Sequence, residues 1–302
     1  MAVQPIPLVP ADKPANVGDN LPPKQPRPRM STRNRVLFFL VAWLVVLMPF
    51  LFWWSTWFGR ALTNKEMGDY LNDNNHPRHI QHAIVQLGQR MSRHDPSAAR
   101  WYADLVRLGS HPREEVRSTD AWVMGQDTSG PGFHEALLKM LEDPSLMVRG
   151  NAALSLVSFG DSSGRPQIIS LMQPVAITTP TAGRVMDTAG VGTAIHQGGL
   201  IVKLRESDGD GQQTRELRSP ITGRVRTLST ATGASVVPGT TIATVEPGEE
   251  QVWEALRALY LVGQLEDLPA IRPYQRELPE VPERLRQQAV ETERAIQERA
   301  SK

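Results

Sequence analysis

The chain has 302 residues, of which 40% are hydrophobic and 22% charged, and its formal net charge is +1 at pH 7. This length accommodates about two domains, and the near-zero charge argues against a nucleic-acid-binding protein, which would need a broad basic face. Because the chain contains no cysteine, disulfide frameworks, thiolate metal sites and cysteine nucleophiles are excluded.

The first 35 residues have a composition of their own. Eight prolines lie from Pro5 to Pro28, and six basic residues outnumber two acidic ones. Proline removes amide donors and favours extended, solvated backbone, so we expect a disordered tail. The stretch Pro22-Pro23-Lys24-Gln25-Pro26 could dock a partner, but a plain spacer is the preferred interpretation.

Residues 36–58 form an uncharged apolar run, VLFFLVAWLVVLMPFLFWWSTWF. At about 1.5 Å per residue the run spans roughly 34 Å, enough to cross a hydrocarbon core of about 30 Å. We expect a transmembrane helix that is kinked at Pro49, with Trp53, Trp54 and Trp57 in an interfacial aromatic belt. A cleaved signal peptide is the rival interpretation, but its apolar region would be only about 7–15 residues long.

Basic residues on the two sides of the run predict its orientation. They are Arg27, Arg29, Arg33 and Arg35 before the run, and Arg60 and Lys65 after it. The positive-inside bias places the N-terminus in the cytoplasm. We therefore expect a single-pass protein of the bacterial inner membrane whose main part is periplasmic.

Residues 59–173 contain a helical pattern that repeats. The dipeptides His76-Pro77, His111-Pro112 and Asp143-Pro144 recur 35 and then 32 residues apart, and each proline suits the first turn of a helix. Val116-Arg117 and Val148-Arg149 follow two of them, and a second helix is expected at 133–141. This pattern resembles the HEAT-like repeat family, whose units pair two helices and must stack to bury their apolar sides.

The pattern resumes after residue 247. Val252–Gly263 is similar to Val148–Gly160, and Leu265–Tyr274 would supply a second helix, shortened by its prolines. A last, highly charged helix is expected to begin at Pro282, with Val281, Leu285, Ala289 and Ile296 on one side. We therefore expect the helical array to continue on both sides of a segment inserted at 174–247.

The inserted segment contains an internal duplication. The motif Pro-x-x-Gly-Arg-Val occupies 180–185 and recurs 40 residues later at 220–225, among β-branched runs separated by Gly and Pro. The segment resembles the biotinyl/lipoyl carrier fold, which is also the barrel-sandwich hybrid of periplasmic adaptor (membrane-fusion) proteins. That resemblance implies two pseudo-symmetric halves of four short strands.

The hairpin between the two halves distinguishes the carrier proteins from the adaptor proteins that have this fold. Carriers attach biotin or lipoate to a lysine in this hairpin, but residues 205–216 contain no lysine and Gln212 lies near the expected place. Covalent biotin or lipoate is therefore not expected. Adaptors carry a long helical arm at the same junction, and a dozen polar residues leave no room for one.

Other candidate sites are weak. His76, His79 and His82 could ligate a metal or a tetrapyrrole, but steps of three residues turn around a helix, so an exposed helix start is the preferred interpretation. Asp208-Gly209-Asp210-Gly211 partly matches a calcium loop, although a solvated hairpin tip is preferred. Gly190-Val191-Gly192 lacks the Lys-Ser/Thr and the helix of a phosphate loop. Aromatic residues assigned to packing between repeats are Trp101, Tyr102, Trp122 and Trp253.

Together these patterns predict an α+β protein that is not an enzyme and has no catalytic, cofactor or metal site. Its function would be that of a scaffold or assembly subunit that binds an integral inner-membrane complex and the extracytoplasmic subunits of that complex. The complex could serve transport, respiration or photosynthesis. The alternative is an abbreviated periplasmic adaptor of an efflux or secretion system. The predicted parts are a tail at 1–35, a transmembrane helix at 36–58, HEAT-like repeats at 59–173, a lipoyl-like β domain at 174–247 and further helices at 248–302.

Overall fold

The computed structural model describes residues 31–57, 60–207 and 213–301, and the side chains of all of these except 51–57. The chain divides into two units, residues 1–60 and 61–302. The described residues form α-helices and two small antiparallel sheets. The chain is therefore of the predicted mixed α and β class.

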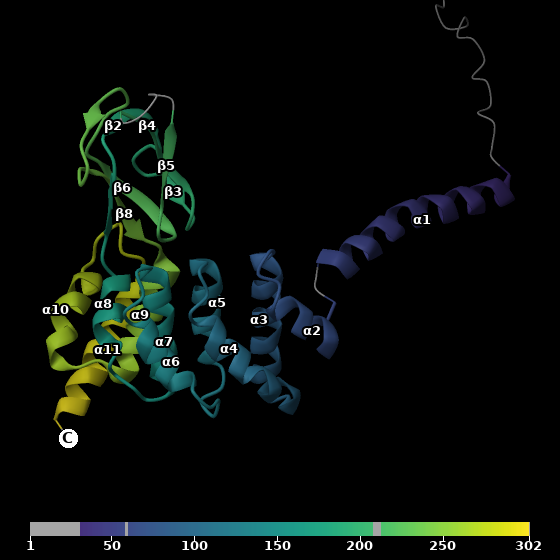
Figure 1. Ribbon diagram of the computed structural model, residues 1–302, viewed down its shortest axis with the longest axis horizontal. Coiled ribbons are helices and arrows are strands. Elements are labelled where there is room, and N and C mark those ends of the chain that lie inside the picture. Colours follow the sequence, from purple (N-terminus) through teal and green to yellow (C-terminus); the bar gives the residue numbers. More distant parts are fainter. Residues whose placement is uncertain (1–30, 58–59, 208–212, 302) are drawn as a thin grey trace, which may run out of the picture. The chain divides into compact units, whose positions relative to one another are not determined.

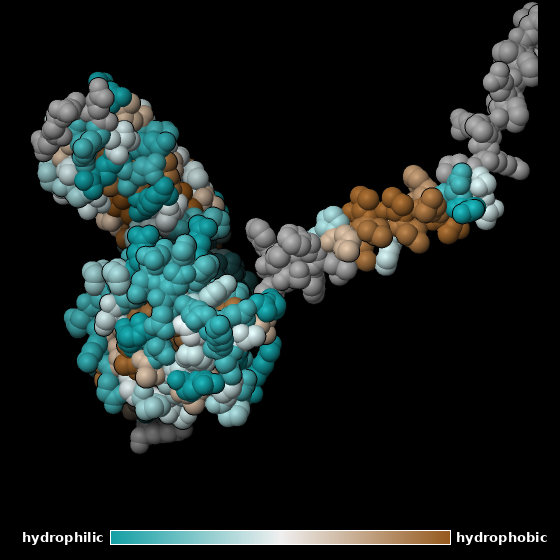
Figure 2. All heavy atoms as spheres, turned by 45° about the vertical axis from the view of Figure 1, so that its right-hand side comes forward, coloured by the Kyte–Doolittle hydropathy of each residue, from teal (hydrophilic) through white to brown (hydrophobic). Residues whose placement is uncertain are grey.

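The first unit contains one helix, α1, which runs from Thr32 to Trp57 with Pro49 inside it. Its stretch Thr32–Phe50 has a mean hydropathy of 1.6 and is entirely unburied, so by length and composition it could cross a membrane. Figure 2 shows apolar residues along most of this helix. The predicted aromatic belt at Trp53, Trp54 and Trp57, and the end of the run at Phe58, lie outside the described side chains.

The second unit begins with short helices joined by tight turns (Figure 1). Helix α2 is held at its start by a capping box between Thr63 and Glu66. Pro77 is the first residue of α3, as predicted, but α5 and α7 begin two residues after Pro112 and Pro144. Those two prolines therefore precede the helices instead of lying in their first turns. The helices are α2 (Asn64–Leu71), α3 (Pro77–Ser92), η1 (Pro96–Trp101), α4 (Tyr102–Leu108), α5 (Glu114–Met124), α6 (Phe133–Met140), α7 (Leu146–Ser158) and α8 (Arg165–Leu171).

Alternate helices pack side by side into a row. Helix α3 packs on α5, and α5 packs on α7. Small residues allow these close contacts, since a Cβ atom on Gly88 would lie 3.0 Å from Val123, and one on Gly125 would lie 2.4 Å from Ser155. The Ser155 hydroxyl donates a hydrogen bond to the Ala121 carbonyl oxygen at 2.8 Å, which ties α7 to α5.

Two arginines at equivalent places in the repeated sequence make equivalent contacts. Arg117 donates from Nη1 to the carbonyl oxygens of His111 and Pro112, at 2.8 and 3.2 Å. Arg149 donates in the same way to those of Asp143 and Pro144, at 2.6 and 3.0 Å. Arg117 also forms a bidentate ion pair with the partly buried Asp143 carboxylate, at 2.6 and 2.9 Å. Each arginine therefore fastens a helix to the turn before it.

The helices after the strands continue the row. They are α9 (Glu249–Val262), η2 (Leu265–Asp267), α10 (Leu268–Ile271), η3 (Arg272–Gln275) and α11 (Glu283–Ala300). Helix α9 packs on α7 and α8, and α11 packs on α9. Arg165 of α8 forms an ion pair with the buried Asp267 carboxylate at 2.8 Å, and the Tyr274 hydroxyl donates to the Met172 carbonyl oxygen at 2.5 Å. One buried apolar cluster thus extends from Leu62 to Ile296 and leaves out the strands between them.

Eight strands between α8 and α9 form two four-stranded antiparallel sheets with orders β1-β8-β6-β3 and β5-β4-β2-β7. If each strand of the first sheet is replaced by the strand four positions away in the other half (β1 by β5, β8 by β4, β6 by β2 and β3 by β7), the order of the second sheet results. The 40-residue duplication in the sequence is therefore matched by an equivalence of strands β1–β4 with β5–β8. The strands are β1 (Val175–Thr178), β2 (Gly183–Thr188), β3 (Ala194–Ile195), β4 (Leu200–Glu206), β5 (Thr214–Arg218), β6 (Gly223–Leu228), β7 (Ser235–Val236) and β8 (Thr241–Pro247).

The repeated motif links the two halves of this β segment. Arg184 donates to the carbonyl oxygen of Gly233, and Arg224 donates to that of Gly192, both at 2.9 Å. Each motif arginine therefore binds a turn in the opposite half. Both turn glycines have positive φ, +84° at Gly192 and +89° at Gly233, a region that favours glycine.

The β segment meets the helices at the ends of its first and last strands. Val175 of β1 pairs with Val245 of β8, so the segment starts and finishes at the same place. Leu146 and Met147, at the start of α7, pack against the buried cluster of the β segment. Figure 1 shows the strands standing at this end of α7 and α9.

Candidate functional site

A hollow that combines exposed aromatic and aliphatic side chains lies along α7, α9 and α11. It has a volume of about 490 Å³ and lies beside a second hollow of about 400 Å³ next to α5. The two hollows share Leu154, Ser158 and Glu254, so we treat them as one groove. The apolar residues that line it are Trp122, Met147, Leu154, Val157, Ala258, Tyr260, Leu261 and Leu171.

Several large side chains of the groove are open to solvent. Trp122 is 49% exposed, Tyr260 41% and Leu261 61%. Trp122 was predicted to pack between repeats, but about half of its surface is exposed to solvent. A Cβ atom added to Gly88 of α3 would lie 3.7 Å from the Trp122 ring, so part of the ring lies between α5 and α3 and the rest faces solvent.

Acidic and basic side chains border the groove. Glu250, Glu254 and Glu291 lie along it, together with Arg257. The guanidinium groups of Arg257 and Arg284 lie over the ring of Trp253, at 4.7 and 3.9 Å from its centre. Trp253 is partly buried and packs against the apolar cluster of the helices, as predicted, and the two cations cover its ring.

Of the other two aromatic residues assigned to packing, Tyr102 is buried and Trp101 is partly buried against the apolar cluster. Tyr102 is 8% exposed, lies against Phe133, and donates its hydroxyl hydrogen to the Asp127 carboxylate. Burial and this carboxylate raise the pKa of Tyr102 to about 12. Trp101 packs against Gly68, where an added Cβ would lie 3.1 Å from the ring.

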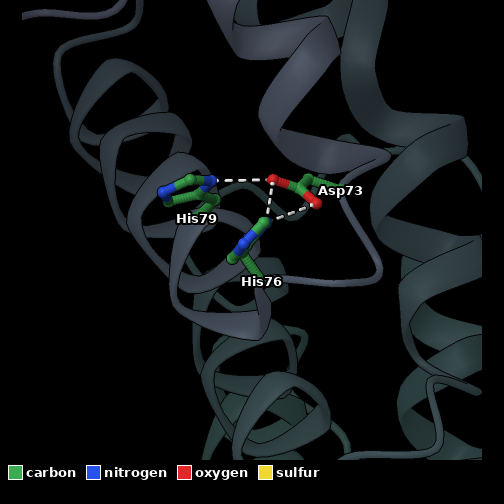
Figure 3. A group of neighbouring side chains, drawn as sticks. All are labelled: Asp73, His76 and His79. Carbon is green, nitrogen blue, oxygen red and sulfur yellow. Dashed lines mark hydrogen bonds and ion pairs between the residues drawn. The ribbon is translucent and has the colours of Figure 1, made fainter.

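A group of titratable side chains lies apart from the groove, at the start of α3. His76 and His79 come together there, as the sequence spacing allows, but the third member of the group is Asp73 and not His82 (Figure 3). The His79 Nδ1 atom lies 2.8 Å from Asp73 Oδ2, and His76 Nδ1 lies 2.9 Å from the same oxygen. Hydrogen bonds to His79 and His76 lower the pKa of Asp73.

His82 is directed elsewhere in α3. Its Nε2 atom lies 3.0 Å from Gln86 Nε2, and Gln86 accepts a hydrogen bond from the backbone amide of Leu62 at 2.7 Å. Sequence reasoning missed Asp73 because it searched for histidine alone. The pattern Asp-x-x-His-x-x-His over residues 73–79 was the available signal.

Two buried polar groups were also missed by sequence reasoning. Asp120 on α5 is fully buried, and neither carboxyl oxygen has a hydrogen-bond partner among the described residues. Burial raises the pKa of Asp120 well above its usual range. His111 is 7% exposed with Nε2 unpaired in the described part of the chain, and burial lowers its pKa.

The β segment offers less for a functional site. Gly190–Gly192 forms a turn between β2 and β3, and the Gly192 amide donates to the Val225 carbonyl oxygen at 2.7 Å. The residues considered for a calcium loop, 208–211, and Gln212 at the position of the carrier lysine lie outside the described residues.

Comparison with known proteins adds little. No protein-family model matches the chain, and no curated protein matches it. Among solved structures, the chain is similar to a single-chain, multi-domain long-chain acyl-CoA carboxylase, with 16% identity and a TM-score of 0.23. The match covers 48% of this chain and 14% of the carboxylase chain. We draw neither a fold nor an activity from a likeness of this size.

Proposed function

We propose that the chain is a non-enzymatic scaffold, anchored in the bacterial inner membrane by α1, that binds an extracytoplasmic part of a membrane protein complex. The observation that carries this proposal is the groove along α7, α9 and α11, with its exposed Trp122, Tyr260 and Leu261. Large aromatic and aliphatic side chains, set within a rim of charged residues, are typical of protein interfaces. The rim here contains Glu254, Glu291 and Arg257.

The proposal includes a finer description of the fold. The row of helices would be a HEAT-like solenoid, supported by the equivalent contacts of Arg117 and Arg149. The β segment would be a barrel-sandwich hybrid of the biotinyl/lipoyl type, supported by the two equivalent strand orders. Solenoids offer long, rigid surfaces suited to holding other proteins.

The adaptor alternative requires a long arm between the halves of the β segment. Strand β4 ends at Glu206 and β5 begins at Thr214, so seven residues connect them. A helical hairpin that reaches an outer channel needs many more residues than this, because a helix advances only about 1.5 Å per residue. We therefore favour the scaffold.

Photocrosslinking in native membranes tests the proposal. The photoreactive amino acid p-benzoylphenylalanine would replace Leu261 or Trp122 in the full chain. If both residues contact one partner, irradiation yields discrete adducts that contain the same second protein. Mass spectrometry of the adducts identifies that protein and distinguishes a transport, respiratory or photosynthetic complex.

The matched control places the same photoreactive group at Glu142, an exposed residue that lies outside the groove. We expect no discrete adduct at Glu142. Equal labelling at all three positions, or no adduct at either groove position, would count against the scaffold.

A further inference from the structure

The group formed by Asp73, His76 and His79 has the composition of a metal site. Asp73 lies in the turn after α2, His76 is the residue just before α3, and His79 lies in the first turn of α3. One potential ligand atom from each of the three residues lies within 4.8 Å of the other two. Figure 3 shows the two imidazole rings facing the carboxylate from different sides.

These residue types suit a divalent transition metal. Imidazole nitrogen and carboxylate oxygen are the usual ligands of Zn²⁺ outside cysteine-containing sites. With bonds of about 2.0–2.1 Å, neighbouring ligands of a tetrahedral ion lie roughly 3.3 Å apart. The present contacts from Asp73 Oδ2 to the two imidazoles are 2.8 and 2.9 Å. For these two pairs a separation of a few tenths of an ångström is enough, while the ligand atoms of His76 and His79, which lie within 4.8 Å of each other, must come to the same spacing around the ion.

Neighbouring groups already hold the three residues together. The His76 amide donates to the Asp73 carbonyl oxygen at 3.0 Å, which closes the turn. The Tyr70 ring stacks on the His79 ring with centres 4.5 Å apart and planes 13° apart. Supporting contacts of this kind orient metal ligands before the ion binds.

We propose that Asp73, His76 and His79 bind one divalent transition-metal ion, with Zn²⁺ as the ion that best fits this ligand set. The ion replaces the hydrogen bonds from Nδ1 of both imidazoles. Metal binding requires Nδ1 of each imidazole to carry no proton. In a neutral imidazole the Nδ1 proton is exchanged through solvent for one on Nε2, whereas a protonated imidazole releases its Nδ1 proton to solvent. Three protein ligands leave one tetrahedral position for water. The site is independent of the groove and does not rest on the scaffold proposal.

Calorimetric titration of the detergent-solubilised full chain with Zn²⁺, without an affinity His tag, tests the site. We expect one equivalent to bind with a dissociation constant on the order of 1–10 µM. Substitution His79→Ala removes a ligand and should weaken binding at least about 100-fold, more than the roughly 10–100-fold typical of a supporting residue. Asp73→Asn keeps the shape of the side chain and should also weaken binding strongly.

His82→Ala is the matched control. His82 lies one helical turn after His79 but bonds Gln86, so this variant should bind Zn²⁺ like the wild type. Circular dichroism verifies that each variant keeps its helices. The site is overturned if the wild type binds no stoichiometric Zn²⁺, if binding survives both His79→Ala and Asp73→Asn, or if His82→Ala weakens it equally.

Discussion

At the scale of single residues, the glycine of each Pro-x-x-Gly-Arg-Val motif is needed because another strand passes very close to it. A Cβ atom on Gly183 would lie 2.4 Å from the Arg205 carbonyl oxygen, and one on Gly223 would lie 1.9 Å from that of Glu246. Both neighbours are backbone atoms in paired strands and cannot move aside. We expect Gly183→Ala and Gly223→Ala to lower the free energy of unfolding of the β segment by about 2–4 kcal/mol each.

Gly190→Ala is the control for this prediction. The nearest atom to an added Cβ there is Thr193 Oγ1 at 3.5 Å, an ordinary contact. This variant should unfold in urea at nearly the wild-type concentration. A Gly223→Ala protein that matched the Gly190→Ala protein would show that β6 and β8 do not pair as closely as described.

Asp120 should make stability depend on pH. Burial raises its pKa in the folded chain well above the value of about 3.9 in an unfolded chain. The unfolded chain therefore binds fewer protons, and stability falls as pH rises from about 4 toward the folded pKa, by at most about 1.4 kcal/mol per pH unit. The Asp120→Asn side chain cannot ionise, so the stability of this variant does not fall for this reason as pH rises.

Urea unfolding of both proteins from pH 4 to pH 8 measures the effect. The free energy of unfolding of Asp120→Asn minus that of the wild type should increase as pH rises. The difference cancels the other titrating groups, which both proteins share. A constant difference across this range would mean that Asp120 is ionised in the folded protein.

Some contacts of single residues could be predicted from the sequence, and others could not. The duplicated motif predicted turns and strands, because Gly, Pro and β-branched residues act on local backbone. That Arg184 and Arg224 reach across to the opposite half could not be predicted, since this contact depends on how the sheets interlock. Nor could the burial of Asp120, an acidic residue that any sequence pattern would place on the surface.

At the scale of elements, the β segment behaves in the chain as an insertion. Its first and last strands pair at Val175 and Val245, while α8 and α9 pack directly on each other. The Gln251 side chain donates to the Leu171 carbonyl oxygen at 2.7 Å, which holds α9 to the end of α8. The helices thus have contacts of their own across the segment.

We therefore predict that the helices fold when residues 175–247 are replaced by a short Gly-Ser linker. Paired residues in neighbouring strands have Cα atoms only about 4.5–5.5 Å apart, so a few linker residues close the gap. Leu146 and Met147 lose their cover and should be changed to serine in the same variant. Circular dichroism should retain a helical spectrum with cooperative thermal unfolding, and an unfolded product would show that the β segment is part of the helical core.

Element boundaries could be predicted where proline or a capping residue fixes them. Pro77 begins α3, and α11 begins directly after Pro282. The predicted starts of α5 and α7 were too early, since each helix begins two residues after its proline. The sequence alone does not distinguish a proline in the first turn of a helix from one just before the helix. The groove was not predicted at all, because it depends on which helix faces remain uncovered after stacking.

At the scale of the whole molecule, the main open prediction is the side of the membrane on which each part lies. Arg27, Arg29, Arg33 and Arg35 on one side of the apolar run outnumber Arg60 and Lys65 on the other. Positively charged flanks are retained in the cytoplasm during insertion. The charge bias therefore predicts a cytoplasmic N-terminus and an extracytoplasmic second unit.

The absence of cysteine makes this prediction easy to test by labelling. One variant carries Ser31→Cys, just before α1, and the other Ser163→Cys, an exposed residue just before α8. A membrane-impermeant maleimide added to intact spheroplasts should label Ser163→Cys and leave Ser31→Cys unlabelled until detergent opens the membrane. The cysteine-free wild type gives the background for both. Labelling of Ser31→Cys alone before detergent would reverse the orientation and place the groove in the cytoplasm, where its partner would then have to be sought.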